Sequence, residues 1–247
     1  MLAVLSPISI DIQFVVIDMS QVKRVVLVLP AITFGLGVWQ VQRLKWKEGI
    51  VAEMEAKQQA TPQPFDLSLA QEDTLDQYAY SRFNVKGSFD HEREIYIGPR
   101  RETNAPPQSD LGFQVVTAFK MSDTGKWVLI NRGWVPREKE LPQARPETLI
   151  VGEQQMTAVL RPIEKKSKFI KLDGSGSKRM IVADIPRMAQ ILDTEPVMLD
   201  VTADNWRFGT LPIPGQTRVT VRNEHMQYAL TWFTLTAAMG LMFWKAR

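Results

Sequence analysis

The chain has 247 residues, of which 45% are hydrophobic and 23% charged, and its formal net charge is +3. This composition excludes neither a globular domain nor a membrane protein, and its mild basic excess gives little reason to expect nucleic acid as a partner. The absence of cysteine excludes a disulfide framework and any thiol-based metal or redox site.

The first transmembrane helix, with an extramembrane extension, is expected over residues 21–60; the N-terminal tail before it, residues 1–20, has no assignable role. The apolar stretch of this helix, residues 25–41, has basic residues on both flanks and no small-residue cleavage site after it. We therefore expect it to stay attached rather than to be removed as a signal peptide. Good helix formers continue to Gln59, and the prolines of residues 61–64 should end the helix.

A β-rich domain is predicted over residues 61–221, because the hydrophobic pattern changes from helical spacing to alternation. Residues 83–89 alternate, and residues 94–98 are predicted to be the strand that returns after a turn at residues 90–92. A second hairpin is expected around the turn sequence Ser-Asp-Thr-Gly at residues 122–125. Its two strands, and the further strands predicted, are residues 113–121, 126–135, 154–160, 179–183, 196–202 and 217–221.

One interior helix of the β domain is predicted after Asp184, a good N-cap residue, with Pro186 in the first turn. The resulting fold class is an antiparallel β-rich domain, either a barrel or a sandwich, with one short helix.

The second transmembrane helix and a short basic tail are predicted over residues 222–247. Its uncharged stretch, residues 226–244, would extend about 28 Å as a helix, enough to cross the core of a bilayer. Basic residues in both short tails of the chain place those tails on the inside. The β domain is then expected in the intermembrane space or the periplasm.

The candidate catalytic residues are few, so we do not expect an enzyme. The only histidines are His91 and His225, and neither a Gly-x-Ser-x-Gly nor a His-Glu-x-x-His motif is present. His91, at the predicted turn, is interpreted as a hydrogen-bonded structural residue rather than a ligand. Arg132 is interpreted in two ways, as a functional residue or as an ion-paired residue at a β-bulge.

Several motifs, taken in order, resemble the Surf-one (surfeit locus protein one) family of cytochrome c oxidase assembly proteins. They are FGLGVWQVQR at residues 34–43, GSFDH at 87–91, NRGWVP at 131–136 and GQTRVTVRNEH at 215–225, continued through Tyr228 and Trp232. The resemblance covers the chain from about residue 25 to the C-terminus. It implies a protein with two membrane spans in the mitochondrial inner membrane, or alternatively in a bacterial inner membrane.

The resemblance also implies a role in maturing or inserting the haem a centre of subunit one of cytochrome c oxidase, respiratory complex IV. The implied partners are subunit one, other complex IV subunits or assembly factors, and membrane lipid. His225 is implied as the ligand of the haem iron, with transient binding because the chain offers a single axial ligand. Further contacts are expected from an aromatic stripe on the helix and from arginines that would pair with the propionates: Tyr228, Trp232, Arg43, Arg218 and Arg222.

Alternatives stay open for both the site and the function. A histidine at membrane depth also anchors helices by hydrogen bonding to lipid headgroups and loops, which is a second interpretation of His225. The alternative function is a stably bound accessory subunit of a respiratory complex that uses the same helices only for packing. A membrane-anchored enzyme is a third class, which the sequence disfavours.

Overall fold

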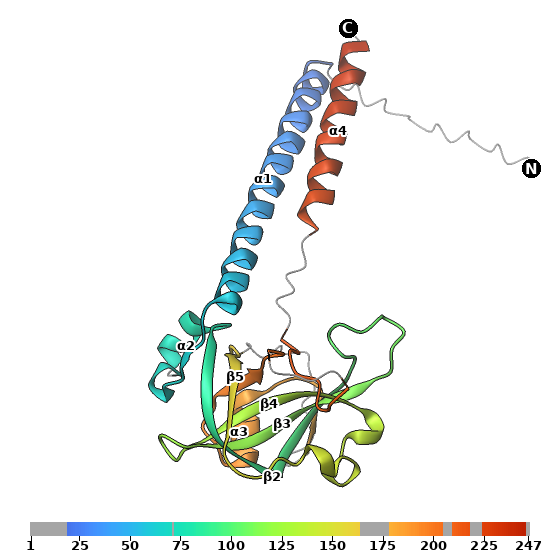
Figure 1. Cartoon of the computed structure of the whole chain (residues 1–247). Helices are drawn as coiled ribbons and strands as arrows, with labels where there is room; N and C mark the ends of the chain where they lie inside the picture. The colour runs from blue at the N-terminus through green and yellow to red at the C-terminus, as the bar shows by residue number, and fades with distance from the viewer. Residues whose placement is uncertain (1–18, 71, 164–177, 205–208, 218–223, 246–247) are drawn as a thin grey trace, which may run out of the picture. The chain divides into compact units, whose positions relative to one another are not determined.

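The computed structural model describes the chain apart from residues 1–18, 71, 164–177, 205–208, 218–223 and 246–247 (Figure 1). The chain folds as two units, Met1–Gly49 with Val221–Arg247, and Ile50–Thr220. In its described part the first unit consists of α-helix, and the second is built around a β-barrel.

The two long helices begin and end close to their predicted limits. α1 (Met19–Gln59) is continuous for 41 residues and, as predicted, ends ahead of Pro62. α4 (His225–Lys245) begins one residue before the predicted apolar stretch. Within the described part of the chain, no helix combines the length and apolar character required to cross a membrane, so the two predicted spans are not confirmed.

The β domain is a closed barrel, which decides between the two predicted architectures. Its strands follow the order β2 (Arg82–Arg100), β3 (Gly112–Met121), β4 (Trp127–Pro136), β7 (Met198–Val201) and β5 (Gln154–Leu160), and β5 pairs with β2 to close the ring. Neighbouring strands are antiparallel except β4 and β7. Two short strands, β1 (Gln63–Pro64) and β6 (Arg179–Met180), pair with β2 in parallel.

The prediction of a hairpin over residues 83–98 is wrong, because β2 runs through that segment as a single strand. In the register with β3, Asp90 faces Ala118 and the next paired residue, Glu94, faces Thr117, so the intervening residues form a bulge. The Asp90 carboxylate accepts hydrogen bonds from the backbone N–H of Glu92 at 3.1 Å and from Nε of Arg93 at 2.7 Å. Polar residues typical of a turn thus stabilise a bulge that bends the strand.

The other predicted elements agree to different extents. The hairpin of β3 and β4 and the strand β5 are confirmed, whereas β6 and β7 are shorter than predicted. α3 (Ile185–Leu192) is confirmed with its cap, since the Asp184 carboxylate accepts from the backbone N–H of Arg187 at 3.4 Å. Most of the strand predicted at residues 217–221 lies outside the described residues. The structure also contains short helices that the sequence did not predict. They lie at Leu67–Ala70, Glu72–Tyr78 (α2), Arg137–Lys139, Pro142–Ala144 and Pro146–Thr148.

The barrel core follows the alternation of its strands. Ile130 of β4 lies in an inner cluster to which all five barrel strands contribute, whereas its neighbour Leu129 packs with Met188 of α3. α3 therefore covers one outer side of the barrel, and the interior is left to a hydrophobic cluster and to the polar groups described below.

Candidate functional site

His225 lies in the contact between α1 and α4. Its Nδ1 is 2.6 Å from Oε1 of Gln40, and its ring meets the edge of Trp39 at 6.4 Å between centroids. An amide oxygen only accepts hydrogen bonds, so Nδ1 carries the proton and donates it. The other ring nitrogen, Nε2, is buried and has no hydrogen-bond partner among the described residues. The imidazole is therefore fixed in the tautomer that leaves the lone pair on Nε2.

α1 and α4 also pack closely around Thr33 and Gly37 of α1. The hydroxyls of Thr33 and Thr236 are 2.7 Å apart. Gly37 is required by the packing, because a Cβ at that position would lie 2.6 Å from the Phe233 ring. Phe34 also meets Phe233, with 5.7 Å between ring centroids. These contacts hold the helix face that carries His225 against α1.

The other predicted site residues lie at varied distances from this contact. Trp232 is half-buried on α4, whereas Tyr228 is 52% exposed. Arg43 is exposed and stacks its guanidinium 3.7 Å above the ring of Trp46. Arg218 and Arg222 lie outside the described residues. Gln40, which the sequence reasoning did not single out, is the residue that orients His225; its place in the Trp39-Gln40 motif was the available signal.

A single imidazole is the metal ligand that the helices offer. Among the described residues there is no group of three or more His, Asp or Glu side chains placed to hold a metal ion. A lone imidazole can serve as one ligand of a metal that carries further ligands of its own.

A second constellation, which sequence reasoning missed, lies inside the barrel around Glu94. The Oε1 atom of this carboxylate is 3.4 Å from Nη1 of Arg132, and its Oε2 accepts from Nη2 of Arg145. Thr117 and Tyr96 complete its partners by donating their hydroxyls at 3.1 and 3.2 Å. The side chains of Arg132, Arg145 and Glu94 are only 5%, 0% and 2% exposed, so two buried guanidinium groups share one carboxylate.

The charges of this cluster determine its protonation. Burial by itself raises the pKa of Glu94, but the contact with His91 and the charges of Arg145 and Arg132 outweigh it, and the pKa lies below its ordinary value. Burial and the neighbouring carboxylate raise the pKa of Tyr96, whose hydroxyl stays protonated and donates to Glu94. Glu94 is therefore the anion of the cluster.

The position of Arg132 agrees with the ion-pair interpretation. Gly133 pairs with Val115 and Asn131 with Val116, so Arg132 is the extra residue of a β-bulge. Its Nη1 lies 3.3 Å from Nδ1 of His91, and Nε2 of His91 donates to the carbonyl of Ile150 at 2.9 Å. The hydrogen-bonded structural role predicted for His91 is thereby confirmed, at a strand bulge and not at a hairpin turn.

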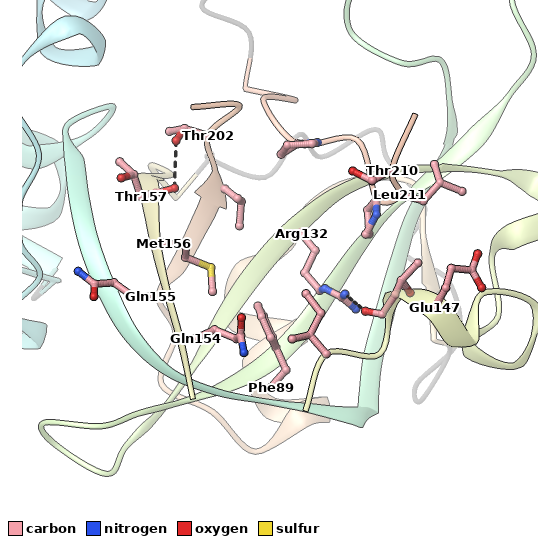
Figure 2. Close-up of a pocket in the computed structure, with 15 residues that line it drawn as sticks. Phe89, Arg132, Glu147, Gln154, Gln155, Met156, Thr157, Thr202, Thr210 and Leu211 are labelled. Atoms are coloured by element: carbon pink, nitrogen blue, oxygen red, sulfur yellow. Dashed lines mark hydrogen bonds between the residues drawn. The ribbon is translucent and has the colours of Figure 1, made fainter. Parts of the chain in front are cut away.

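A cavity of about 400 Å³ opens beside Arg132 (Figure 2). The side chains of Phe89, Gln154 and Met156 lie around it, together with Thr210 and Leu211. Arg132 is the one arginine among the described residues that line it, and about half of those residues have apolar side chains. The barrel therefore holds a ligand-sized space with a cation in its wall.

Comparison with known proteins gives one consistent family. The model of the SURF1 family matches residues 27–237. Surfeit locus protein 1 of Mus musculus is 37% identical over 237 residues, which cover 92% of this chain and 76% of the mouse protein. The Homo sapiens protein of the same name is 37% identical, with 92% and 78% covered, and the SURF1-like protein of Drosophila melanogaster is 36% identical, with 89% and 75% covered.

Proposed function

This chain belongs to the SURF1 family, and from that membership we propose that it is an assembly factor for cytochrome c oxidase that assists maturation or insertion of the haem a centre of subunit one. The family match supports the general role, and the haem a step rests on the resemblance of motifs and on the geometry of His225. We propose that the protein acts by holding and positioning, without catalysis of its own.

The observation that carries the proposal is the state of the His225 imidazole. A histidine that binds a metal usually donates its second ring N–H to an oxygen acceptor, which fixes the tautomer and the ring orientation. His225 makes such a bond to Gln40, and its buried Nε2 has no partner in the part of the chain that the structure describes. A buried acceptor without a partner is costly for a purely structural residue, so the arrangement favours a ligand at Nε2.

The residues that would hold haem a are those next to this nitrogen. His225 would supply the axial nitrogen, and the half-buried Trp232 offers an aromatic surface on the same helix. Tyr228 and Arg43 are exposed, and we propose that they contact the periphery of the haem. His225 would thus provide one ligand to the iron of haem a, which would supply redox chemistry when bound, and a single imidazole would suffice for reversible retention.

We also propose that α1 and α4 anchor the protein in a membrane, with the β domain in the intermembrane space or periplasm. The hydropathy of the described helices does not by itself identify spans. Support comes from large apolar side chains that both helices leave exposed, including Phe34 at 54%, Leu230 at 68% and Met242 at 72%. Apolar side chains gathered in this way are unfavourable in water and favourable in lipid.

The proposal is tested by replacing His225, the proposed iron ligand. The full-length protein, purified from cells that synthesise haem a, should show a haem absorption band. His225→Gln should abolish this band, since an amide is a poor iron ligand. Oxidase from cells carrying this variant should contain less haem a. An unchanged band and unchanged oxidase would reject the haem role, whereas a loss restricted to His225→Leu would support hydrogen-bonded anchoring.

The accessory-subunit function is the second candidate, and one observation favours it. His225, Phe233 and Thr236 of α4 already contact α1, which is what helices used only for packing would show. The two functions differ in stoichiometry. Purified mature oxidase that contains one copy of this chain per complex would favour the subunit, and its absence from mature oxidase would favour the assembly factor.

A further inference from the structure

The cavity beside Arg132 lies where the barrel wall is incomplete. β5 pairs with β7 from Ala158 to Leu160, whereas its earlier residues, Gln154 to Thr157, pair only with β2 in the described sheet. The side of β5 that faces away from β2 is therefore without a neighbouring strand at Gln154 to Met156. The cavity opens at this gap, so a ligand could reach the barrel interior without displacing a strand.

The cavity wall carries an excess of positive charge. Among the described residues, Arg132 and Arg145 are both paired with the carboxylate of Glu94, so two guanidinium charges face one carboxylate charge there. The hydrogen bonds of Arg132 use Nη1 and Nη2, and its Nε–H has no partner among the described residues. Burial, together with the neighbouring charge of Arg145, lowers the pKa of Arg132 to about 10, although the carboxylate of Glu94 opposes this shift.

Among the described residues that line the cavity, one carries a carboxylate, and it is not a counterion for Arg132. Glu147 is part of the lining, but its side chain is 59% exposed and lies 3.5 Å from Nζ of Lys139. An exposed pair of this kind is well solvated. The buried guanidinium of Arg132 therefore remains the dominant charge for anything that enters the cavity.

The rest of the lining is suited to an apolar group. Phe89 lies beneath the guanidinium of Arg132, with 5.0 Å between Cζ and the ring centroid, and Met156 extends from β5 toward the same space (Figure 2). The opposite side is formed by residues including Leu211 and Pro212. A volume of about 400 Å³ lies within the range of small-molecule sites, near its lower end.

We propose that this cavity binds a small amphipathic anion, with its charged head at Arg132 and its apolar tail along Phe89, Met156 and Leu211. The chemistry is that of a single-chain carboxylate, such as a medium-chain fatty acid, or of a phosphate monoester with a similar tail. Recognition needs one charge-assisted hydrogen bond from a buried donor and a matched apolar surface. The site belongs to the barrel, and the inference goes beyond the proposed role of the helices.

The test uses the full chain in lipid nanodiscs and measures equilibrium binding of radiolabelled octanoate, with empty nanodiscs subtracted to remove partition into lipid. Octanoate should bind saturably at one site, and octanol, which has the same tail without the charge, should compete at least about tenfold more weakly. Octyl phosphate as the competitor distinguishes a phosphate monoester from a carboxylate. If it competes more tightly than unlabelled octanoate, the ligand is a phosphate monoester, and if it competes more weakly, the ligand is a carboxylate. Equal competition by octanol and octanoate would overturn the proposal.

Variants locate the site. Arg132→Gln should weaken octanoate binding more than about tenfold, whereas Arg161→Gln should not. The control is matched, because Arg161 also pairs with a buried carboxylate, Asp200 at 3.3 Å, but does not line the cavity. A second variant, Gln154→Trp, fills the cavity while leaving Arg132 and Glu94 in place.

Gln154→Trp should also abolish binding, and Lys120→Trp, on an exposed position of β3, should leave it unchanged. The filled variant keeps the test decisive if Arg132→Gln does not fold. Octanoate affinity that is unchanged in Gln154→Trp would place the ligand elsewhere and overturn the proposal. None of these measurements depends on haem, so their failure leaves the proposed function untouched, and the reverse also holds.

Discussion

Arg145 donates an Nη2–H to Oε2 of Glu94 inside the barrel, where their side chains are 0% and 2% exposed. Arg145 comes from the segment of short helices after β4, and Glu94 from the far side of the bulge in β2. The ion pair therefore holds the segment of short helices, residues 137–148, against the barrel wall. Because Arg132 shares the same carboxylate, the three side chains form one coupled unit.

Glu94→Gln should destabilise the β domain strongly, because it leaves two buried guanidinium groups without an anion. The expected loss is about 3–5 kcal/mol of unfolding free energy, measured by urea denaturation of the purified full-length protein. Glu153→Gln is the matched control, because Glu153 also forms an ion pair, with Lys86 at 2.8 Å, but its side chain is 49% exposed. The control should lose much less, because an exposed ion pair is well solvated. Equal losses would show that the buried cluster contributes no more than a surface pair.

Acid should unfold the domain partly through Glu94. The pKa of Glu94 is lowered on folding from its ordinary value of 4.5, so its ionised form is stabilised in the folded state. This contribution is fully present above pH 4.5 and is lost as the pH falls below 4.5 toward the folded pKa. The urea midpoint of the natural chain should fall over that range. Glu94→Gln should show a shallower fall; an identical pH slope would contradict the lowered pKa.

The sequence predicted the elements that depend on local patterns. The hydrophobic and proline pattern placed the end of α1, the Asp-Thr-Gly turn placed the hairpin of β3 and β4, and Asp184 placed the start of α3. Each of these signals is complete within a few residues, so no knowledge of the rest of the chain was needed.

The parts that the sequence did not predict depend on contacts distant along the chain. Whether residues 90–93 form a turn or a bulge is decided by β3, which pairs with both halves of β2. The closure of the barrel depends on β5 returning to β2, which no local pattern encodes. Arg145 reaches Glu94 from a segment without hydrophobic periodicity, so nothing in its neighbourhood marked it as buried.

The contact between α1 and α4 should be detectable by an engineered disulfide. The hydroxyls of Thr33 and Thr236 are 2.7 Å apart, and the chain contains no cysteine that could compete. Thr33→Cys with Thr236→Cys should therefore oxidise to an intramolecular disulfide in membranes, seen as a faster-migrating band without reductant. Thr33→Cys with Thr234→Cys is the control, since Thr234 is exposed on α4, whereas Thr236 is half-buried beside Thr33. Equal crosslinking of both pairs would argue against the described contact.

Gly37 should be the position on α1 that tolerates a side chain least. A Cβ there would lie 2.6 Å from the ring of Phe233, whereas a Cβ at Gly35 would meet nothing within 4 Å. Gly37→Leu should lower the yield of the Thr33–Thr236 disulfide, because the larger side chain separates the helices. Gly35→Leu on the same helix should leave the yield unchanged. A normal yield in Gly37→Leu would mean that the helices repack without cost.

Gln40 should act as a positioning residue for His225, a prediction that rests on the proposed function. Its amide oxygen is 2.6 Å from Nδ1 of His225 and fixes the tautomer with the lone pair on Nε2. Gln40→Leu should lower haem affinity about 10–100-fold, as expected for loss of the group that orients a ligating histidine, and Gln40→Glu, which keeps an acceptor, should restore it. Haem content of the purified full-length protein is the measurement, with Gln42→Leu on the exposed face of α1 as the control. The Thr33–Thr236 disulfide, introduced into each variant, reports whether the helices still pack. Haem loss with normal crosslinking supports an orienting role; equal haem content in Gln40→Leu and Gln42→Leu would show that the Gln40 hydrogen bond serves packing alone.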